Sequence, residues 1–74
     1  MFINFKRLEQ APEQLQIGDI GFIIERQYSA TREFIRNSKI KAARKGRNKF
    51  IKKSDLLAYF ERNNWLPSGF LQEQ

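Results

Sequence analysis

Apolar residues in the middle of the chain recur with a helical period. Ile20, Ile23 and Ile24 stand at i, i+3 and i+4, which places them on one face of a helix. We therefore expect a first helix over residues 18–25 whose apolar face packs on the core.

Three other residues of this segment affect the stability of the expected helix. Gly18 suits the N-cap, and Asp19 would bring a negative charge to the first turn, where it suits the helix dipole. Gly21 lies inside the helix and costs about 0.5–1 kcal/mol relative to alanine. Either another helix approaches Gly21 closely, or the position simply tolerates glycine.

A second helix is expected over residues 29–37, with Ser29 as a suitable N-cap. Its inward face would be formed by Phe34 and Ile35 together with either Ala30 or Thr31. Arg32 and Arg36 stand four residues apart and would share the outer face. Because two like charges at this spacing lower helix stability, the pair indicates an anion opposite them, such as a phosphate or a base edge.

The period changes over residues 39–52. Residues 39–42 alternate between lysine and apolar side chains, and a second short run of strand-forming residues follows Gly46. A glycine-centred turn between two such runs predicts a β-hairpin. The tip of this hairpin would carry Arg44, Lys45, Arg47 and Lys49. These like charges repel one another, and a phosphate backbone lying along the hairpin would explain them.

A third helix is expected after the hairpin, with Ser54 as its N-cap and Asp55 in its first turn. Its core face would be formed by Leu56, Tyr59 and Phe60, and it would end at Asn63 and Asn64. The following tail is apolar for a terminus because it contains Trp65, Leu66, Phe70 and Leu71. This tail either folds back on the domain or docks on a partner.

The chain is long enough for one domain. Its 74 residues leave no room for a second hydrophobic core. Residues 1–16 are a mixed leader, in which Phe2, Ile3, Phe5 and Leu8 would form a short strand or a helical turn that packs on the core. We expect the folded core over residues 17–63 and the tail over residues 64–74.

The charge is concentrated in one window. Eleven of the fourteen Lys and Arg residues lie between positions 26 and 53, where Glu33 is the single acid, so this window carries a charge of +10. The rest of the chain holds three bases and seven acids and carries −4. Such segregation indicates a polyanion-binding protein, with nucleic acid as the first candidate. The alternative is a solvated basic face with no partner.

The composition also excludes several kinds of chemistry. The absence of Cys and His removes the common zinc sites and the usual nucleophile–base pairs, and the eight acids are scattered. We expect no catalytic residue, no metal, no cofactor and no small-molecule ligand. The N-terminal apolar run is too short for a signal peptide, and no stretch approaches the ~20 apolar residues of a membrane span. We expect a cytoplasmic protein, associated with the nucleoid when bound to DNA.

The predicted order is helix, turn, helix, basic hairpin, helix. Two short helices joined by a tight turn form a helix-turn-helix, whose second helix can enter a DNA major groove. The cations fall on that second helix and on the hairpin. The supporting helices carry acids instead, namely Asp19, Glu25, Asp55 and Glu61. This pattern predicts a small α+β fold, a winged helix-turn-helix, that binds double-stranded DNA.

About residues 15–63 resemble the excisionase-type winged-helix domains of the MerR-like superfamily, also called recombination directionality factors. The strongest match is KGRNKFIKKSDLLAYFE, which is similar to the wing turn, second strand and helix start of that family. Within it Gly46, Ile51, Asp55 and Leu56 stand at the family's spacing. The chain departs from the family at Ser38, where glycine is usual.

The resemblance implies DNA contacts on two elements. On the second helix these are Ser29, Thr31, Arg32, Glu33 and Arg36. In the wing they are Lys41, Arg44, Lys45, Gly46, Arg47, Asn48 and Lys49. Arg32 is the expected base reader, because arginine suits the O6 and N7 atoms of guanine. Among the wing cations, Arg47 is the better candidate to contact a narrow A·T minor groove.

Three charged residues keep alternative roles. Glu33 would accept from cytosine N4 or, as we favour, pair locally with Arg36 or Asn37. Lys52 and Lys53 would be either flanking phosphate contacts or solvated surface.

The resemblance also implies a function without catalysis. Such proteins bind and bend attachment-site DNA and assist an integrase, and the tail would contact the integrase or a neighbouring copy. A small phage- or plasmid-type transcription regulator is the alternative. An RNA-binding module is a third hypothesis, which requires exposed aromatic residues among the cations. We expect Tyr28, Phe34 and Phe50 in the core instead.

Overall fold

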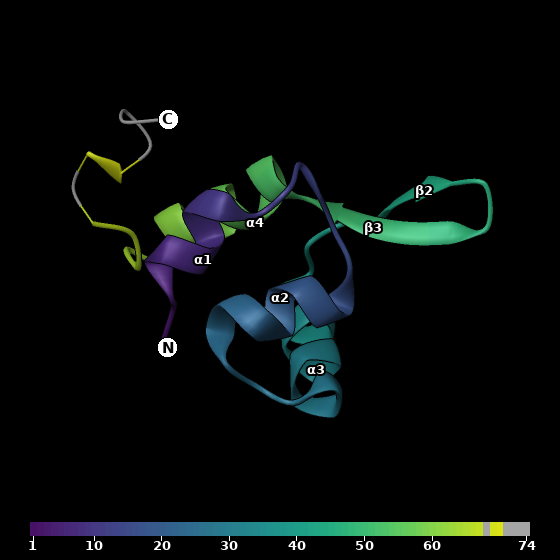
Figure 1. Cartoon of the computed structure of the whole chain (residues 1–74), viewed down its shortest axis with the longest axis horizontal. Coiled ribbons are helices and arrows are strands. Elements are labelled where there is room, and N and C mark those ends of the chain that lie inside the picture. Colours follow the sequence, from purple (N-terminus) through teal and green to yellow (C-terminus); the bar gives the residue numbers. More distant parts are fainter. Residues whose placement is uncertain (68, 71–74) are drawn as a thin grey trace.

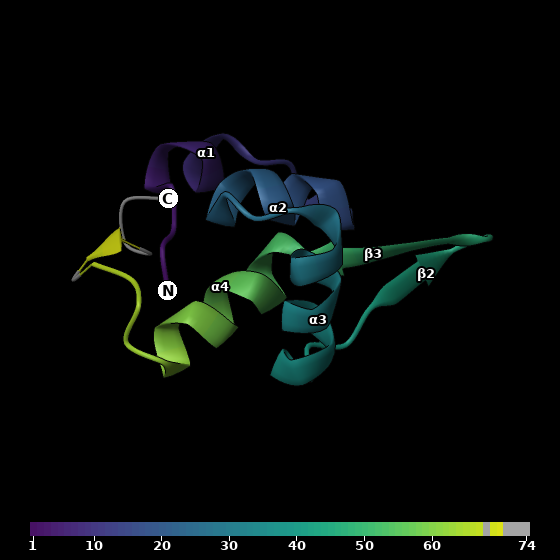
Figure 2. The same ribbon diagram turned by 90° about the horizontal axis from the view of Figure 1, so that it is seen from below.

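Helices gather at one end of the molecule and a β-hairpin projects from them (Figures 1 and 2). The computed structural model describes residues 1–67, 69 and 70, and in this part it holds four α-helices and one three-stranded antiparallel sheet. In chain order the elements are α1 (Phe5–Gln10), β1 (Gln14–Leu15), α2 (Ile17–Ile24), α3 (Tyr28–Ser38), β2 (Ala43–Lys45), β3 (Asn48–Lys52) and α4 (Lys53–Arg62). The fold is α+β, as predicted. Within the described residues, no helix has both the length and the apolar character needed to cross a membrane.

Residues 1–16 add a helix and a strand to the fold. The side-chain oxygen of Asn4 accepts a hydrogen bond from the N–H of Arg7 (3.1 Å) and so caps α1. The N–H of Asn4 donates to the carbonyl of Ile23 at the end of α2 (2.8 Å). Leu8 of α1 is completely buried. Of the two predicted alternatives for this segment, the structure therefore shows the helical one, followed by a strand.

The strand order in the sheet is β1-β3-β2, so β3 is central. β1 pairs with β3 through Gln14↔Lys52 and Leu15↔Ile51. β2 pairs with β3 through Ala43↔Phe50, Arg44↔Lys49 and Lys45↔Asn48. The predicted hairpin is therefore present, and Gly46 begins its turn with a φ of 64°, a left-handed conformation that favours glycine.

The core is assembled from α1, α2, α4 and the inner part of the sheet, and Phe34 and Ile35 of α3 pack against it while half-buried. Its buried apolar side chains are Ile3, Leu8, Leu15, Ile20, Ile23, Ile24, Ile51, Leu56, Leu57 and Phe60. The predicted apolar face of α2 is confirmed. On α4, Leu56 and Phe60 are buried as predicted, while Tyr59 is half-buried against the core.

The described part of the tail folds back on the domain. The rings of Trp65 and Tyr59 lie 5.7 Å apart between centroids, and those of Phe70 and Phe5 also lie 5.7 Å apart. Leu66 packs on the core as well. Leu71, the last apolar residue predicted to contact a partner, lies outside the described residues.

Three helices begin earlier than predicted. Their N-caps are Gln16, Gln27 and Lys52, so Gly18, Ser29 and Ser54 lie inside the first turns. For α2 the reason is Asp19, whose carboxylate accepts a hydrogen bond from the N–H of Gln16 (2.9 Å). For α3, the N–H of Thr31 already donates to the carbonyl of Gln27 (2.9 Å). The helical hydrogen bonds therefore start before the small polar residues that suit a cap.

Helices α2 and α3 approach each other closely at Gly21. A Cβ at this position would lie 2.9 Å from Oγ1 of Thr31 and 2.9 Å from the carbonyl oxygen of Arg26. Both distances are shorter than a real Cβ contact. Of the two explanations for this glycine, the close approach of a second helix is confirmed.

Candidate nucleic-acid interface

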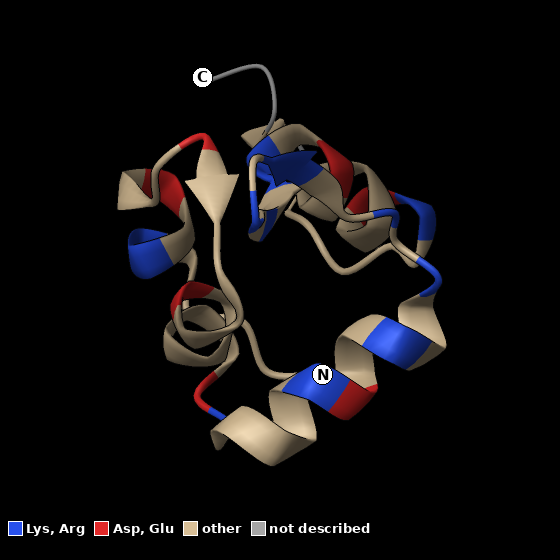
Figure 3. Cartoon of the chain, turned by 90° about the vertical axis from the view of Figure 1, so that its right-hand side faces the viewer, with Lys and Arg blue, Asp and Glu red and all other residues tan. Residues whose placement is uncertain are grey.

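The basic window forms an exposed surface. Ten of its eleven cations are exposed, namely Arg26, Arg32, Arg36, Lys39, Lys41, Arg44, Lys45, Arg47, Lys49 and Lys52. Figure 3 shows blue residues on the hairpin, on the segment that leads into it and on α3. Within the described part of the chain, the ion pair that forms is Arg7–Glu25 (3.3 Å), which involves none of these ten. These cations are therefore free of internal acidic partners among the described residues.

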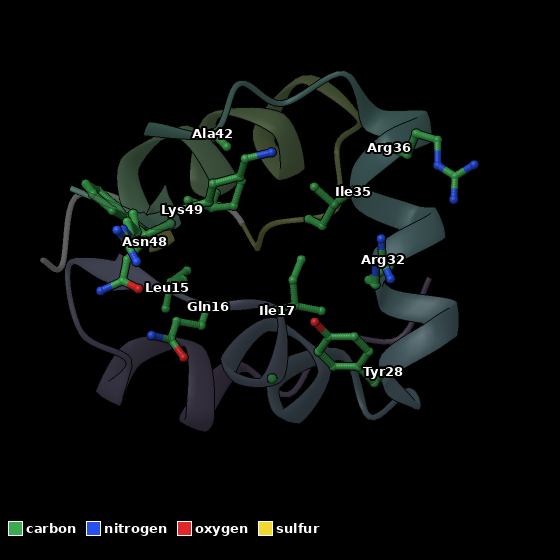
Figure 4. A pocket seen from close by; sticks show the side chains of 14 residues that line it. Leu15, Gln16, Ile17, Tyr28, Arg32, Ile35, Arg36, Ala42, Asn48 and Lys49 are labelled. Carbon is green, nitrogen blue, oxygen red and sulfur yellow. The ribbon is translucent and has the colours of Figure 1, made fainter. Parts of the chain in front are cut away.

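An open groove of about 790 Å³ lies between α3, the start of α2 and the hairpin (Figure 4). From α3 it is lined by Tyr28, Arg32, Ile35 and Arg36, and from the turn and β3 by Arg47, Asn48, Lys49, Phe50 and Ile51. Leu15, Gln16, Ile17, Gly18 and Ala42 complete the lining. Two walls with cations thus face each other across a partly apolar floor.

The structure places the predicted residues of α3 on different sides. Arg32 and Arg36 line the groove. Ser29 and Glu33 are exposed but do not line it. Thr31 has no exposed surface, and its hydroxyl donates to the carbonyl of Gln27 (2.9 Å). The DNA contact implied for Thr31 is wrong, because the packing of α3 on Gly21 turns this residue inward. Of the two alternatives for the inward face of the helix, Ala30 or Thr31, Thr31 is the one that is buried.

Glu33 does not make the local contact with Arg36 or Asn37 that we favoured. In the part of the chain that the structure describes, it forms neither an ion pair nor a side-chain hydrogen bond with Arg36 or Asn37. It borders a separate hollow beside Met1 and Trp65. The predicted local pairing of Glu33 is therefore not observed.

The predicted wing residues are all exposed, and they divide between the groove and the outer hairpin. Arg47, Asn48 and Lys49 line the groove. Arg44, Lys45 and Gly46 belong to β2 and the turn without lining it. Lys41 lies in the segment before β2, so its assignment to the hairpin is wrong. The run of residues 39–42, expected as the first strand of the hairpin, lies before β2, and the pairing with β3 begins at Ala43.

The position of Lys53 contradicts both predictions for it, a flanking phosphate contact and a solvated surface residue. Its side chain is only 9% exposed, and its Nζ donates to the carbonyls of Glu9 (3.0 Å) and Ala11 (3.1 Å). The ammonium group thus satisfies carbonyls at the end of α1. Lys52, its neighbour, is exposed as predicted. Nothing in the basic run distinguishes the two lysines, since the distinction depends on α1, which is more than forty residues away.

Tyr28 is an exposed aromatic residue of the groove that sequence reasoning missed. It was expected in the core, yet its side chain is 60% exposed. Phe34 is half-buried and packs against the core, and Phe50 is half-buried in the hairpin. The signal for Tyr28 was its position directly after the polar residues 25–27, which offer no apolar surface to cover it.

Acidic residues give no sign of a metal site. Within the described residues, no group of three His, Cys, Asp or Glu side chains lies close enough to hold a metal ion.

Comparisons with known proteins find no matching family model, no matching curated protein and no matching solved structure. The resemblance to excisionase-type domains stays a prediction from the residues quoted above.

Proposed function

We propose that the protein binds double-stranded DNA, without catalysing a reaction, as a winged helix-turn-helix domain. The order of elements supports this proposal, since two packed helices (α2 and α3) are followed by a hairpin (β2 and β3) and the sheet order is β1-β3-β2. In such an arrangement α3 is the helix that enters the major groove, and the hairpin is the wing that follows the adjacent backbone.

The groove between α3 and the hairpin is the observation that carries the proposal. Arg32 and Arg36 stand on one wall, and Arg47 and Lys49 stand on the other. A phosphate backbone that enters this space meets cations from both sides, which a solvated basic face without a partner does not require. Arg32 then reads a guanine in the major groove. Arg47 reaches toward the minor groove from the wing.

The biological role follows from the resemblance. As an excisionase-like factor, the protein binds and bends attachment-site DNA and assists an integrase. One domain of this size covers few base pairs, so useful affinity requires several copies or a partner protein. Trp65, Leu66 and Phe70 are half-buried, and each keeps an exposed edge for such a contact. A small transcription regulator of phage or plasmid type is the alternative role of the same surface.

RNA binding is the second candidate, and the exposure of Tyr28 among cations favours it. Proteins that read single-stranded RNA stack successive bases on aromatic side chains. In this groove Tyr28 is the most exposed ring, whereas Phe50 is half-buried. Facing walls of cations suit a regular backbone better than a row of unstacked bases, so we favour duplex DNA.

A competition experiment tests the proposal. Labelled random-sequence duplex DNA bound to the protein is displaced by equal lengths of duplex DNA, single-stranded DNA or single-stranded RNA. The proposal predicts that duplex DNA competes best. Stronger competition by RNA would favour the second candidate. Once a preferred duplex has been selected, measuring its bend by energy transfer separates a DNA-bending excisionase from a regulator that leaves DNA straight.

A further inference from the structure

Tyr28 is placed where it does little for the fold. It is the first residue of α3, and more than half of its side chain is in solvent. Among the described residues, its ring pairs with no other aromatic ring and its hydroxyl has no hydrogen-bond acceptor. The other tyrosine, Tyr59, is half-buried and packs edge-to-face on Phe34 and Trp65. A tyrosine that stabilises the fold is expected to have a packed ring, as Tyr59 has, because aromatic residues stabilise proteins mainly by burying their rings.

Tyr28 lies in the groove, on the same face of α3 as Arg32 and Arg36. Figure 4 shows its hydroxyl pointing into the hollow, toward Ile17. Tyr28, Arg32 and Arg36 follow one another at intervals of four residues, so they form one row along α3. All three line the groove. A neutral O–H donor therefore stands at the end of a row of two cations.

The chemistry of this position suits a phosphate oxygen. Half to two-thirds of protein–DNA hydrogen bonds go to phosphate and sugar, and tyrosine hydroxyls are among the donors. Stacking on a base would use the ring of Tyr28 instead, but it requires a base that has left the helical stack. A duplex presents its phosphates without that cost.

We infer that Tyr28 donates a hydrogen bond from its hydroxyl to a backbone phosphate of duplex DNA, and so fixes the start of α3 against the DNA. This inference rests on the proposed function. It adds a contact that carries no charge to an interface otherwise made of cations. A neutral donor releases no counterion, so its contribution to affinity is independent of salt, unlike that of Arg47.

The test compares Tyr28→Phe, which removes only the hydroxyl, with Tyr28→Ala and with the control Tyr59→Phe. Binding of each to a labelled random-sequence duplex is measured by fluorescence anisotropy over a range of salt concentrations. Tyr28→Phe should weaken binding about three- to tenfold at each salt concentration, with an unchanged slope of log affinity against log salt. Tyr59→Phe should bind like the unchanged protein.

Two results would overturn the inference while leaving DNA binding intact. If Tyr28→Phe binds the duplex as tightly as the unchanged protein and Tyr28→Ala does not, the ring makes the contact. If neither substitution at Tyr28 weakens binding, the residue lies outside the interface. Failure of the unchanged protein to bind the duplex would remove the proposed function, and the Tyr28 contact with it.

Discussion

Arg44 and Lys49 lie directly opposite each other in the β-hairpin, as partners of β2 and β3. Both side chains are exposed. Like charges in such a cross-strand pair destabilise the sheet. The hairpin is therefore better suited to a state in which an anion lies beside both residues than to the free protein.

Replacing one member of this pair should separate stability from binding. Arg44→Gln removes the repulsion and should raise the free energy of unfolding by about 0.2–1 kcal/mol at low salt, as measured by urea denaturation. The same substitution should weaken binding to duplex DNA. Lys6→Gln on α1 removes an equal charge outside the basic window of residues 26–53 and is the control for both measurements. An Arg44→Gln variant with lower stability and unchanged DNA affinity would contradict this interpretation of the hairpin.

Gly21 and Gly18 of α2 should respond oppositely to alanine. At Gly21 the new Cβ would collide with Thr31 and a backbone carbonyl, so Gly21→Ala should lower the free energy of unfolding by about 1–3 kcal/mol. At Gly18 nothing lies within 4 Å of the added Cβ. Gly18→Ala should therefore raise stability by about 0.4–1 kcal/mol. Thermal or urea unfolding measures both, and equal effects at the two positions would refute the close packing of α2 on α3.

The adjacent lysines Lys52 and Lys53 should also differ. Lys53→Met leaves the carbonyls of Glu9 and Ala11 without their donor and should cost about 1–3 kcal/mol of stability. Lys52→Met removes the same charge from an exposed position and should change stability by less than about 0.5 kcal/mol. Urea denaturation of the two variants gives the comparison. Similar stabilities would mean that Lys53 does not hold the end of α1.

Arg32 should determine a base preference. On a duplex selected for tight binding, Arg32→Ala should cost about 1–3 kcal/mol and relax the preference at one base pair. Titration against the selected and a scrambled duplex gives the test. Equal losses on both duplexes would assign Arg32 to the phosphate backbone instead of a base.

Local sequence patterns were sufficient to predict α2, α3, the hairpin and α4. These elements show their apolar period or their turn glycine within a few residues, as Ile20, Ile23 and Ile24 do in α2. The strand β1 has no such signal. It is two residues long and is held by pairing with β3, whose partner residues are 36 to 38 positions away. Contacts of that range cannot be inferred from a local pattern.

The direction of individual side chains was harder to predict than the elements. Tyr28 and Lys53 stand in elements that were predicted correctly, yet each points differently from our expectation. Thr31 takes the inward one of the two directions predicted for it. Their directions depend on how each helix is rotated against its neighbour, which the Gly21 contact sets for α3 and the end of α1 sets for α4. A charge pattern identifies the basic elements, but it does not distinguish a surface lysine from a buried one.

The salt dependence of duplex binding tests the central proposal most directly. Fluorescence anisotropy with labelled random-sequence duplex DNA is measured at about 50 and 200 mM salt. We predict micromolar-range affinity at the lower concentration and a fall of about 100-fold or more at the higher one, because several Lys and Arg side chains displace counterions from phosphates. Absence of binding at low salt, or binding that salt does not weaken, would contradict the assignment of the groove between α3 and the hairpin as a DNA-binding surface.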